Sequence, residues 1–410
     1  MNTELIEFFN VVLRFTHIVA AIMWIGNSLL FTWMEINLIK DPENKNSLGY
    51  MNMLHAGGVF FLDKRVIDPN DIPARLHVFK WQSYTTWLSG IALIVLTFYT
   101  RSGTLLLDPS KSDLLGWHAS LISALSIIAA WFIYDAIWKS PLKKVPAAAV
   151  AVLALGLIGY AYWIDGFFNS RFVYLQVGAM IATTMTANVR FVIIPNQKKI
   201  MAALLEGKPH DLELGRQAKL RSLTNHYVTF PVIFLMLSAH FPILYGNRLY
   251  IPIMIIIAVS LVIIKWMMNL YNKFSDWLFA SVATFILGTG GVALCIFLPN
   301  MGAKPVDTNT PAISSTAIKG KELFSSKGCS ACHLPVDSSI APSLHGIYGT
   351  ERPLTDGSSV LADEAYIKHS IQFSTDQVSK GYAPAMPSFD KALSEEELNQ
   401  LVAYIESLSK

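Results

Sequence analysis

The feature that most constrains this chain is a series of long apolar stretches that runs through its first 298 residues. A helix of about 20 apolar residues is long enough to cross the hydrocarbon core of a bilayer. Eight stretches reach this length, at about 6–38, 81–100, 114–138, 146–164, 171–190, 222–241, 250–271 and 276–298. The chain is 53% hydrophobic and only 15% charged, a balance that a single soluble domain does not show. The pattern predicts a bundle of eight transmembrane helices.

A short motif near the C-terminus carries the clearest chemistry. Residues 328–333 read GCSACH, with thiols at Cys329 and Cys332 and an imidazole at His333. Two thiols at this spacing can add to the two vinyl groups of one porphyrin, and the adjacent histidine can bind its iron. The alternatives are a redox C-x-x-C pair or half of a zinc site. Neither needs the histidine, and the sequence has no second C-x-x-C, so the motif predicts one covalent heme c.

A methionine further along the chain is the predicted sixth ligand of this iron. Met386 lies in GYAPAMPSF, a loop interrupted by prolines. A lone methionine is more often core packing, but this one is not on an apolar helical face, which favours ligation. A His/Met pair raises the reduction potential of a heme and suits electron transfer. The predicted iron ligands here are therefore His333 and Met386.

Two helices are expected around this heme. Residues 394–397 read SEEE, a capping box that starts a helix, and residues 317–328 predict a second helix that crosses it. The apolar face of the capped helix contains Leu398, Leu401, Ile405 and Leu408. The expected fold is all-α: an eight-helix transmembrane domain at 1–302, then a small cytochrome c domain at 317–410 that is similar to class I. Residues 303–316, rich in Pro, Thr and Ser, predict a flexible linker.

The heme motif and the loop charges predict the same orientation in the membrane. Heme is attached to c-type proteins outside the bacterial cytoplasm, so the cytochrome domain is expected in the periplasm of a multi-pass inner-membrane protein. With an even number of spans, the N-terminus lies there too. Under this topology the cytoplasmic loops contain 17 Lys and Arg residues and the periplasmic loops only Arg101, Lys111, Arg171 and Arg248. This asymmetry is what the positive-inside rule predicts.

Composition excludes several classes of protein. With three cysteines, two of them assigned to heme, the chain cannot be a disulfide scaffold. The net charge of +3 and the absence of a basic aromatic-rich run argue against nucleic-acid binding. The first residues, MNTELIEFF, lack the positive segment and cleavage site of a secretory signal peptide.

Ionisable residues within membrane spans are costly and are therefore candidates for function. Three histidines fall on the periplasmic side of the predicted bundle, namely His17, His118 and His240. A single buried histidine is more often a hydrogen-bonded core residue than a ligand. Electrons from a cytoplasmic-side reaction would have to cross a core of about 30 Å to reach heme c. The hypothesis is a heme b in the outer leaflet, held by two of these histidines.

A second polar set falls at the cytoplasmic ends of the predicted helices. It consists of Glu35, Asp135, Asn188, Arg190, Asn225, His226 and Asp276. His55 and His77, in the first cytoplasmic loop, could join it. Asp135 and Asp276 have a simpler explanation, because carboxylates at helix ends can be solvated or can pair with loop lysines.

Several stretches resemble a known family. RFTHIVAAIMWIGNSLLFTW, HAGGVFF, LHVFKWQSYTTWLSG, GAMIATTMTANVRFVIIP and NHYVTFPVIFLMLSAHF are similar to the membrane-bound, cytochrome c-fused urate oxidase (urate hydroxylase) family. The likeness runs over nearly the whole chain in the same order. The chain departs from the family pattern at Thr224-Asn225-His226, Ser238-Ala239-His240 and His55-Ala56-Gly57. R-x-x-H followed by W-x-G, from Arg14 to Gly26, also resembles bundles that bind heme b, which favours His17 as an iron ligand.

The resemblance implies an activity and a substrate site. Members oxidise urate to 5-hydroxyisourate and pass the electrons through their own heme c to a respiratory acceptor, a soluble cytochrome c or a terminal oxidase. A buried planar monoanion needs hydrogen-bond donors and a cation. Arg190, Asn188, Asn225, His226 and His55 are expected to supply these groups, with Glu35 or a histidine as general base.

Two other functions are compatible with a heme c domain fused to a bundle. A membrane-anchored electron carrier would only dock to a respiratory complex, and would have mostly apolar helix interiors. A heme- or porphyrin-handling protein is suggested by the first-helix motif alone. The buried polar residues and the whole-chain resemblance favour the purine oxidoreductase.

Overall fold

The structure is a computed structural model of the 410-residue chain. It describes residues 3–43, 47–65, 78–108, 111–112, 114–208, 211–301, 315–333, 341–382, 384, 386–390 and 392–409. His77 and most of the predicted linker, residues 303–314, lie outside the described residues; residues 315 and 316 already belong to a helix.

Each of the eight predicted apolar stretches forms a helix. They are α1 (Thr3–Ile36), α2 (Trp81–Thr97), α3 (Gly116–Lys139), α4 (Pro146–Asp165), α5 (Ser170–Ala187), α7 (Leu212–Leu237), α9 (Tyr250–Asn269) and α10 (Trp277–Met301). Six helical segments among the described residues are long and apolar enough to cross a membrane, and α2 and α7 are not among them. Helix α2 has only 17 residues, and the first turns of α7 are charged. The chain is thus a multi-helix protein suited to a membrane, and eight spans remain a prediction.

The fifth predicted span is the start of a longer helical rod. Helix α5 continues through the π-helical segment η4 (Asn188–Ile193) into α6 (Ile194–Leu205), giving 36 helical residues in all. Pro195 has no N–H group to bond back along the helix, and a wider π-turn accommodates this loss. Helix α6 packs on the first turns of α7, where the Asn196 side chain donates to the Leu214 carbonyl at 3.1 Å. Most of the segment that the sequence assigns to a cytoplasmic loop is therefore helical.

The all-α expectation is wrong in two places, because two small antiparallel sheets form. Strands β1 (Ser47–His55) and β2 (Gly58–Arg65) pair in the first loop, and β3 (Glu351–Pro353) pairs with β4 (Ser359–Leu361) in the cytochrome domain. The first hairpin turns at Ala56 and Gly57, both with positive φ, as the tightest hairpin turn requires. Short connections complete the fold: η1 (Tyr99–Arg101), η2 (Ser102–Leu106), η3 (Pro141–Lys144), η5 (Ser238–His240) and α8 (Pro242–Tyr245).

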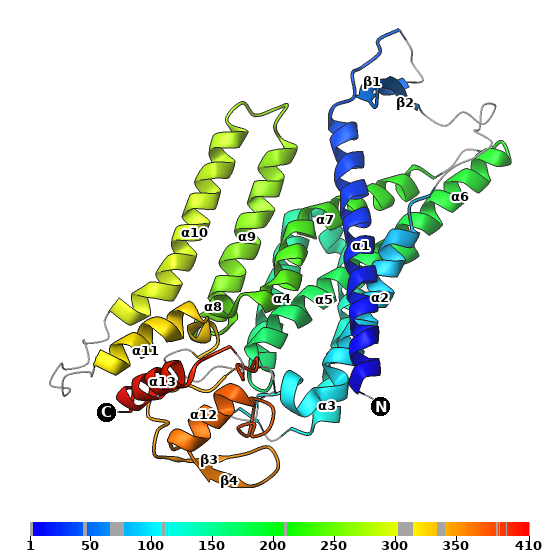
Figure 1. Ribbon diagram of the computed structural model, residues 1–410. Helices are drawn as coiled ribbons and strands as arrows, with labels where there is room; N and C mark the ends of the chain where they lie inside the picture. Colours follow the sequence, from blue (N-terminus) through cyan, green and yellow to red (C-terminus); the bar gives the residue numbers. More distant parts are fainter. Residues whose placement is uncertain are drawn as a thin grey trace.

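The helices form a central group with a pair of helices on each side. Figure 1 shows α3, α4, α5 and α7 in the centre, α1 and α2 on one side, and α9 and α10 on the other. The largest buried cluster lies in the central group and includes Leu106, Phe168, Phe172, Tyr174 and Leu235. The start of α1 and the C-terminal domain lie at the same end of the bundle (Figure 1). This arrangement agrees with the prediction that both lie on one side of the membrane.

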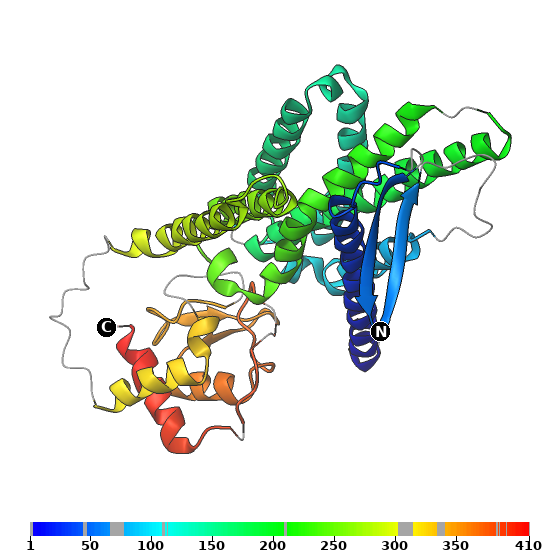
Figure 2. The same cartoon turned by 90° about the horizontal axis from the view of Figure 1, so that it is seen from above.

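The C-terminal domain has the two predicted helices. Helix α11 (Ser315–Ser326) crosses α13 (Glu395–Ser407), and the smaller α12 (Glu364–Gln372) and η6 (Cys329–Ala331) complete the domain. The predicted capping box is present, because Ser394 and Glu397 exchange side-chain to backbone hydrogen bonds. The crossing is close: a Cβ on Gly320 would lie 1.9 Å from the Gln400 carbonyl oxygen. Figure 2 shows this domain on the side of α8 and α10, away from α1.

Candidate functional site

The C-terminal domain contains a cavity at the heme motif. The cavity and the open solvent at its mouth together occupy about 970 Å³, and the wall is mainly apolar, with Phe324, Ile367, Ile371, Leu401 and Ile405 among the lining residues. Cys329, His333 and Met386 line the same cavity. An apolar pocket with these three residues on its wall fits a covalently attached, largely buried porphyrin.

Each predicted axial ligand is also held in place by a hydrogen bond to the protein. His333 Nδ1 lies 2.9 Å from the Pro342 carbonyl, which makes Nδ1 the donor and leaves Nε2 free for a metal. Burial lowers the pKa of His333, the bond to Pro342 opposes this, and the neutral imidazole is the form that binds iron. The backbone carbonyl of Met386 accepts a 2.6 Å bond from Ser374, which fixes the loop of the predicted sixth ligand. These residues fit a His/Met heme c, which supplies one-electron transfer when bound.

A second group of polar side chains lies along α7, in the half of the bundle that is predicted to face the cytoplasm; we call it the inner polar layer. Its buried members are Asn188, Asn225 and His226, from the sequence prediction, and also Arg221 and Lys265. Its partly buried members are Asp135, which the sequence also predicted, and Thr32 and Asn269. On the side of α5, Asn188 Nδ2 donates to Asn225 Oδ1 at 2.8 Å, and Asn225 Nδ2 donates to the Met185 carbonyl at 2.9 Å. Asn188 is fully buried and its Oδ1 has no hydrogen-bond partner, so an acceptor remains available there.

On the other side of α7, His226 joins three helices. The ring is 2% exposed, with Nδ1 3.2 Å from the Thr32 hydroxyl of α1 and Nε2 3.1 Å from Asn269 Oδ1 of α9. A neutral imidazole donates from one nitrogen and accepts at the other, so both partners can be satisfied. Lys265, one turn before Asn269, is also buried and lies over the ring of Phe230 at 5.3 Å.

An ion pair within this layer joins α3 to α7. Arg221 is 5% exposed and donates from Nη2 to Asp135 at 2.7 Å. Its guanidinium lies 4.8 Å from the ring centre of Tyr134, with Trp131 and Trp138 also within 6.0 Å. Asp135 also pairs with the exposed Lys139 at 2.6 Å, so the simpler explanation of Asp135 as a partner of loop cations applies in part.

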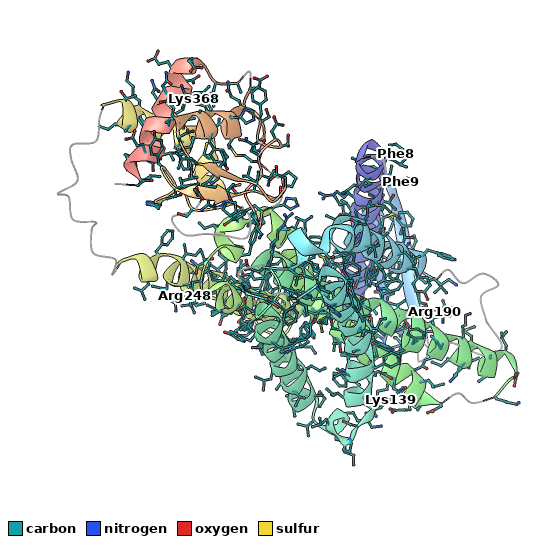
Figure 3. All side chains as sticks on the ribbon, turned by 90° about the horizontal axis from the view of Figure 1, so that it is seen from below. Phe8, Phe9, Lys139, Arg190, Arg248 and Lys368 are labelled. Atoms are coloured by element: carbon teal, nitrogen blue, oxygen red, sulfur yellow. The ribbon has the colours of Figure 1, made fainter. Side chains whose placement is uncertain are left out.

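Three predicted substrate residues lie outside this layer. Arg190 is exposed on η4, with its guanidinium 5.5 Å from the Phe191 ring (Figure 3). Glu35 pairs with Lys64 at 3.1 Å and Lys219 at 3.2 Å, and about half of its side chain is exposed. His55 is exposed at the end of β1. The structure therefore joins Asn188 to Asn225 and places His226 next along α7 on a different face of the helix, whereas Arg190, Glu35 and His55 lie outside this layer.

Sequence reasoning missed the two buried cations of the layer. Arg221 was assigned to a loop because the apolar stretch of α7 begins after it, whereas α7 itself begins at Leu212. Lys265 lies within an apolar span, IIIAVSLVIIKWMMN, and an isolated charge in such a stretch was the signal that could have found it. Thr32 and Asn269 carry no such signal, because uncharged polar residues are common on helix surfaces.

The three outer histidines lie on different elements. His17 on α1 packs against α2, with Nδ1 2.9 Å from the Thr86 carbonyl and 3.1 Å from the Ser89 hydroxyl. His118 stacks on Trp117 at the start of α3, and His240 is exposed in η5. Within the described residues, no group of three or more His, Cys, Asp or Glu side chains is arranged to hold a metal ion. A shared ligand set from these histidines is not apparent in this arrangement.

The outer end of the bundle approaches the heme motif. Tyr245 at the end of α8 is 3% exposed. Burial raises the pKa of Tyr245 to about 12, with the Arg171 guanidinium opposing the rise and the nearby Cys332 thiol adding to it. Figure 3 shows Arg248, which follows α8, on the bundle, and Lys368 on the C-terminal domain. The attachment cysteine Cys332 thus lies near the outer end of the helices.

Comparison with known protein families agrees with both parts of the chain. A family model described as urate oxidase N-terminal matches residues 3–295, and a cytochrome c model matches residues 317–409. No curated protein sequence matches the chain. Because the first match covers well over half of the chain, and the second contains the heme-attachment motif and its cavity, the protein belongs to the urate oxidase N-terminal family and carries a fused cytochrome c domain.

Proposed function

We propose that the protein is a membrane-bound oxidoreductase that converts urate to 5-hydroxyisourate in the inner polar layer and delivers the electrons to its own heme c. The reaction adds water at C5 of urate and releases two protons and two electrons. The observation that carries the proposal is the buried hydrogen-bonded layer on α7, within the segment that matches the urate oxidase family.

The layer offers chemistry that suits a planar purine anion. Urate presents N–H donors and carbonyl acceptors around its ring, and buried amides can pair with both. Asn188 Oδ1 is an acceptor without a protein partner, and Asn225 is bonded to Asn188 at 2.8 Å. His226 lies on the adjacent face of α7 and can accept or release a proton as water adds. We assign these three residues to the reaction.

The exposed residues of the sequence prediction receive a different role. Glu35 already holds two lysines, so its carboxylate is a poor candidate for the general base. Arg190 is exposed on η4, and His55 is exposed at the turn of the β1–β2 hairpin. We propose that these three residues act at the entrance, where positive charge at Arg190 attracts the anion.

The electrons must travel from the inner polar layer to the outer side of the bundle. The proposed orientation places the N-terminus and the cytochrome domain in the periplasm of a bacterial inner membrane. His17 supports a heme b as an intermediate carrier, because the Thr86 carbonyl can hold Nδ1 as donor and leave Nε2 for iron. A pyridine hemochrome spectrum of purified protein with only the c-type band would exclude this heme. A soluble cytochrome c or a terminal oxidase is the proposed final acceptor.

The proposal is tested by adding urate without oxygen to purified, oxidised, heme-loaded protein and following the reduced band of heme c. We expect reduction in the wild type, and a rate at least 100-fold lower in His226→Ala and Asn225→Ala. His345→Ala, on the exposed surface of the C-terminal domain, is the matched control for the histidine. A wild-type protein that is reduced by a quinol but not by urate would instead support the membrane-anchored electron carrier.

A further inference from the structure

The buried amine of Lys265 lacks the partner that buried cations usually have. The residue is 5% exposed and lies within an apolar helix of mean hydropathy 2.4. Its interactions are with the Phe230 ring and with neighbouring His226, and among the described residues no carboxylate forms an ion pair with it. The other buried cation of the layer, Arg221, has Asp135 at 2.7 Å. Lys265 is therefore the group in the layer that lacks a counter-ion.

The direction of the helix explains why this amine does not reach the aqueous boundary. Side chains on a helix point toward its N-terminus. In α9 the N-terminus is Tyr250, which bonds to Asp165 at the end of the bundle opposite to the inner polar layer. Lys265 therefore points toward the middle of the bundle, where Phe230 lies one turn beyond His226 on α7. A lysine in a membrane span usually extends its side chain toward the nearer membrane–water interface. The Lys265 side chain extends in the opposite direction.

Two pairs of residues one turn apart face each other across α7 and α9. His226 and Phe230 lie on α7, and Lys265 and Asn269 lie on α9, so each pair occupies one face of its helix. His226 bonds to Asn269 at 3.1 Å, and Lys265 lies over Phe230 at 5.3 Å. The result is an aromatic face, an imidazole and an amine at one point of the helix interface.

We infer that Lys265 binds the anionic charge of the substrate at the α7–α9 interface and is the specificity-determining cation of the site. The sequence alone predicts Arg190 in this role. This inference rests on the proposed function and adds the cation to it. A protonated amine in an apolar environment is costly without a counter-ion, and an organic anion removes that cost. The flat face of Phe230 and the imidazole of His226 suit a planar anion better than a compact one such as phosphate.

The experiment measures equilibrium binding of radiolabelled urate to heme-loaded protein in nanodiscs, separately from heme reduction. Lys265→Met removes the amine and keeps the length of the side chain, and Lys265→Arg keeps the charge. The matched control is Lys273→Met, because Lys273 is exposed after the same helix. We expect the dissociation constant to rise at least 10-fold in Lys265→Met, to rise less in Lys265→Arg, and to stay unchanged in Lys273→Met. Hypoxanthine, a purine that is neutral at pH 7, should bind wild type and Lys265→Met equally.

Folding is checked in the same samples. Because Met is apolar, Lys265→Met should melt at the wild-type temperature or above it, whereas lost binding with a lower melting temperature would point to misfolding. In that case Lys265→Gln, which is neutral but polar, repeats the comparison: wild-type melting with a dissociation constant at least 10-fold higher supports the inference, and an unchanged dissociation constant overturns it. Urate binding to Lys265→Met with the wild-type dissociation constant overturns the inference and leaves the proposed function intact. Wild-type protein that binds urate, but whose heme c is not reduced by it, refutes the proposed reaction while the binding comparison still tests Lys265. Wild-type protein that does not bind urate refutes both.

Discussion

The ion pair between Arg221 and Asp135 allows a quantitative prediction about the stability of the helix bundle. The side chains are 6% and 14% exposed, and they join α7 to α3 at 2.7 Å. Removing one partner of a buried pair typically costs about 3–5 kcal/mol, because the other charge stays buried. Each remaining residue keeps some support here: Asp135 retains Lys139 at 2.6 Å, and Arg221 retains its aromatic neighbours. We therefore expect the lower end of this range, about 3 kcal/mol for each single change.

The double change separates a charge effect from a packing effect. If the cost of each single variant comes from the stranded charge, then Arg221→Met with Asp135→Asn strands none, and its cost should be about 0–1 kcal/mol rather than about 6 kcal/mol. The free energy of unfolding is measured by titration with SDS in mixed micelles. Lys139→Met is the control, and it should cost less than about 1 kcal/mol because the lysine is 74% exposed. Single costs that add fully in the double variant would refute the reasoning.

Three further predictions concern the cytochrome domain. Gly320→Ala should destabilise it by about 1–3 kcal/mol or more, because the added Cβ would lie 1.9 Å from a carbonyl oxygen of α13; an unchanged melting curve of the heme Soret band would contradict this. Met386→His should lower the midpoint potential of heme c in a potentiometric titration, and an equal potential would remove Met386 from the iron. Ser394→Ala should cost about 1 kcal/mol at pH 7 in thermal unfolding. The capping bonds from Ser394 lower the pKa of Glu397, so its stabilisation is present above the unfolded pKa of about 4.3 and is lost as the pH falls through the folded value. The stability of Ser394→Ala should accordingly change less with acid than that of the wild type.

The inner polar layer also connects the helices of the bundle to one another. Asn188, Asn225 and His226 bond across α5, α7, α9 and α1, so the layer also fixes the relative position of these helices. Buried polar networks are tolerated when each member is satisfied. Asn188 Oδ1 lacks a hydrogen-bond partner, and the Lys265 amine has no carboxylate counter-ion among the described residues; we expect a substrate to bind at these two positions.

The sequence by itself determined the elements that depend on local patterns. The eight apolar stretches became helices, because an apolar segment without water must satisfy its own backbone hydrogen bonds. The heme motif, the capping box of α13 and the helix α11 could be predicted from the sequence. Each depends on residues that lie within one or two helical turns of one another along the chain. Even the family could be identified from short stretches in the right order.

Only the tertiary structure decided which polar residues come together. Arg190 and Asn188 are two residues apart, yet Arg190 is exposed and Asn188 is fully buried, because adjacent positions on a helix face different directions. Lys265 and His226 are far apart in sequence, and they became neighbours only when α7 and α9 packed side by side. The hairpin that carries His55 and the π-helical extension of α5 likewise follow from pairing and packing. Contacts of this kind depend on helix rotation and crossing, which the hydrophobic pattern of these all-round apolar helices leaves open.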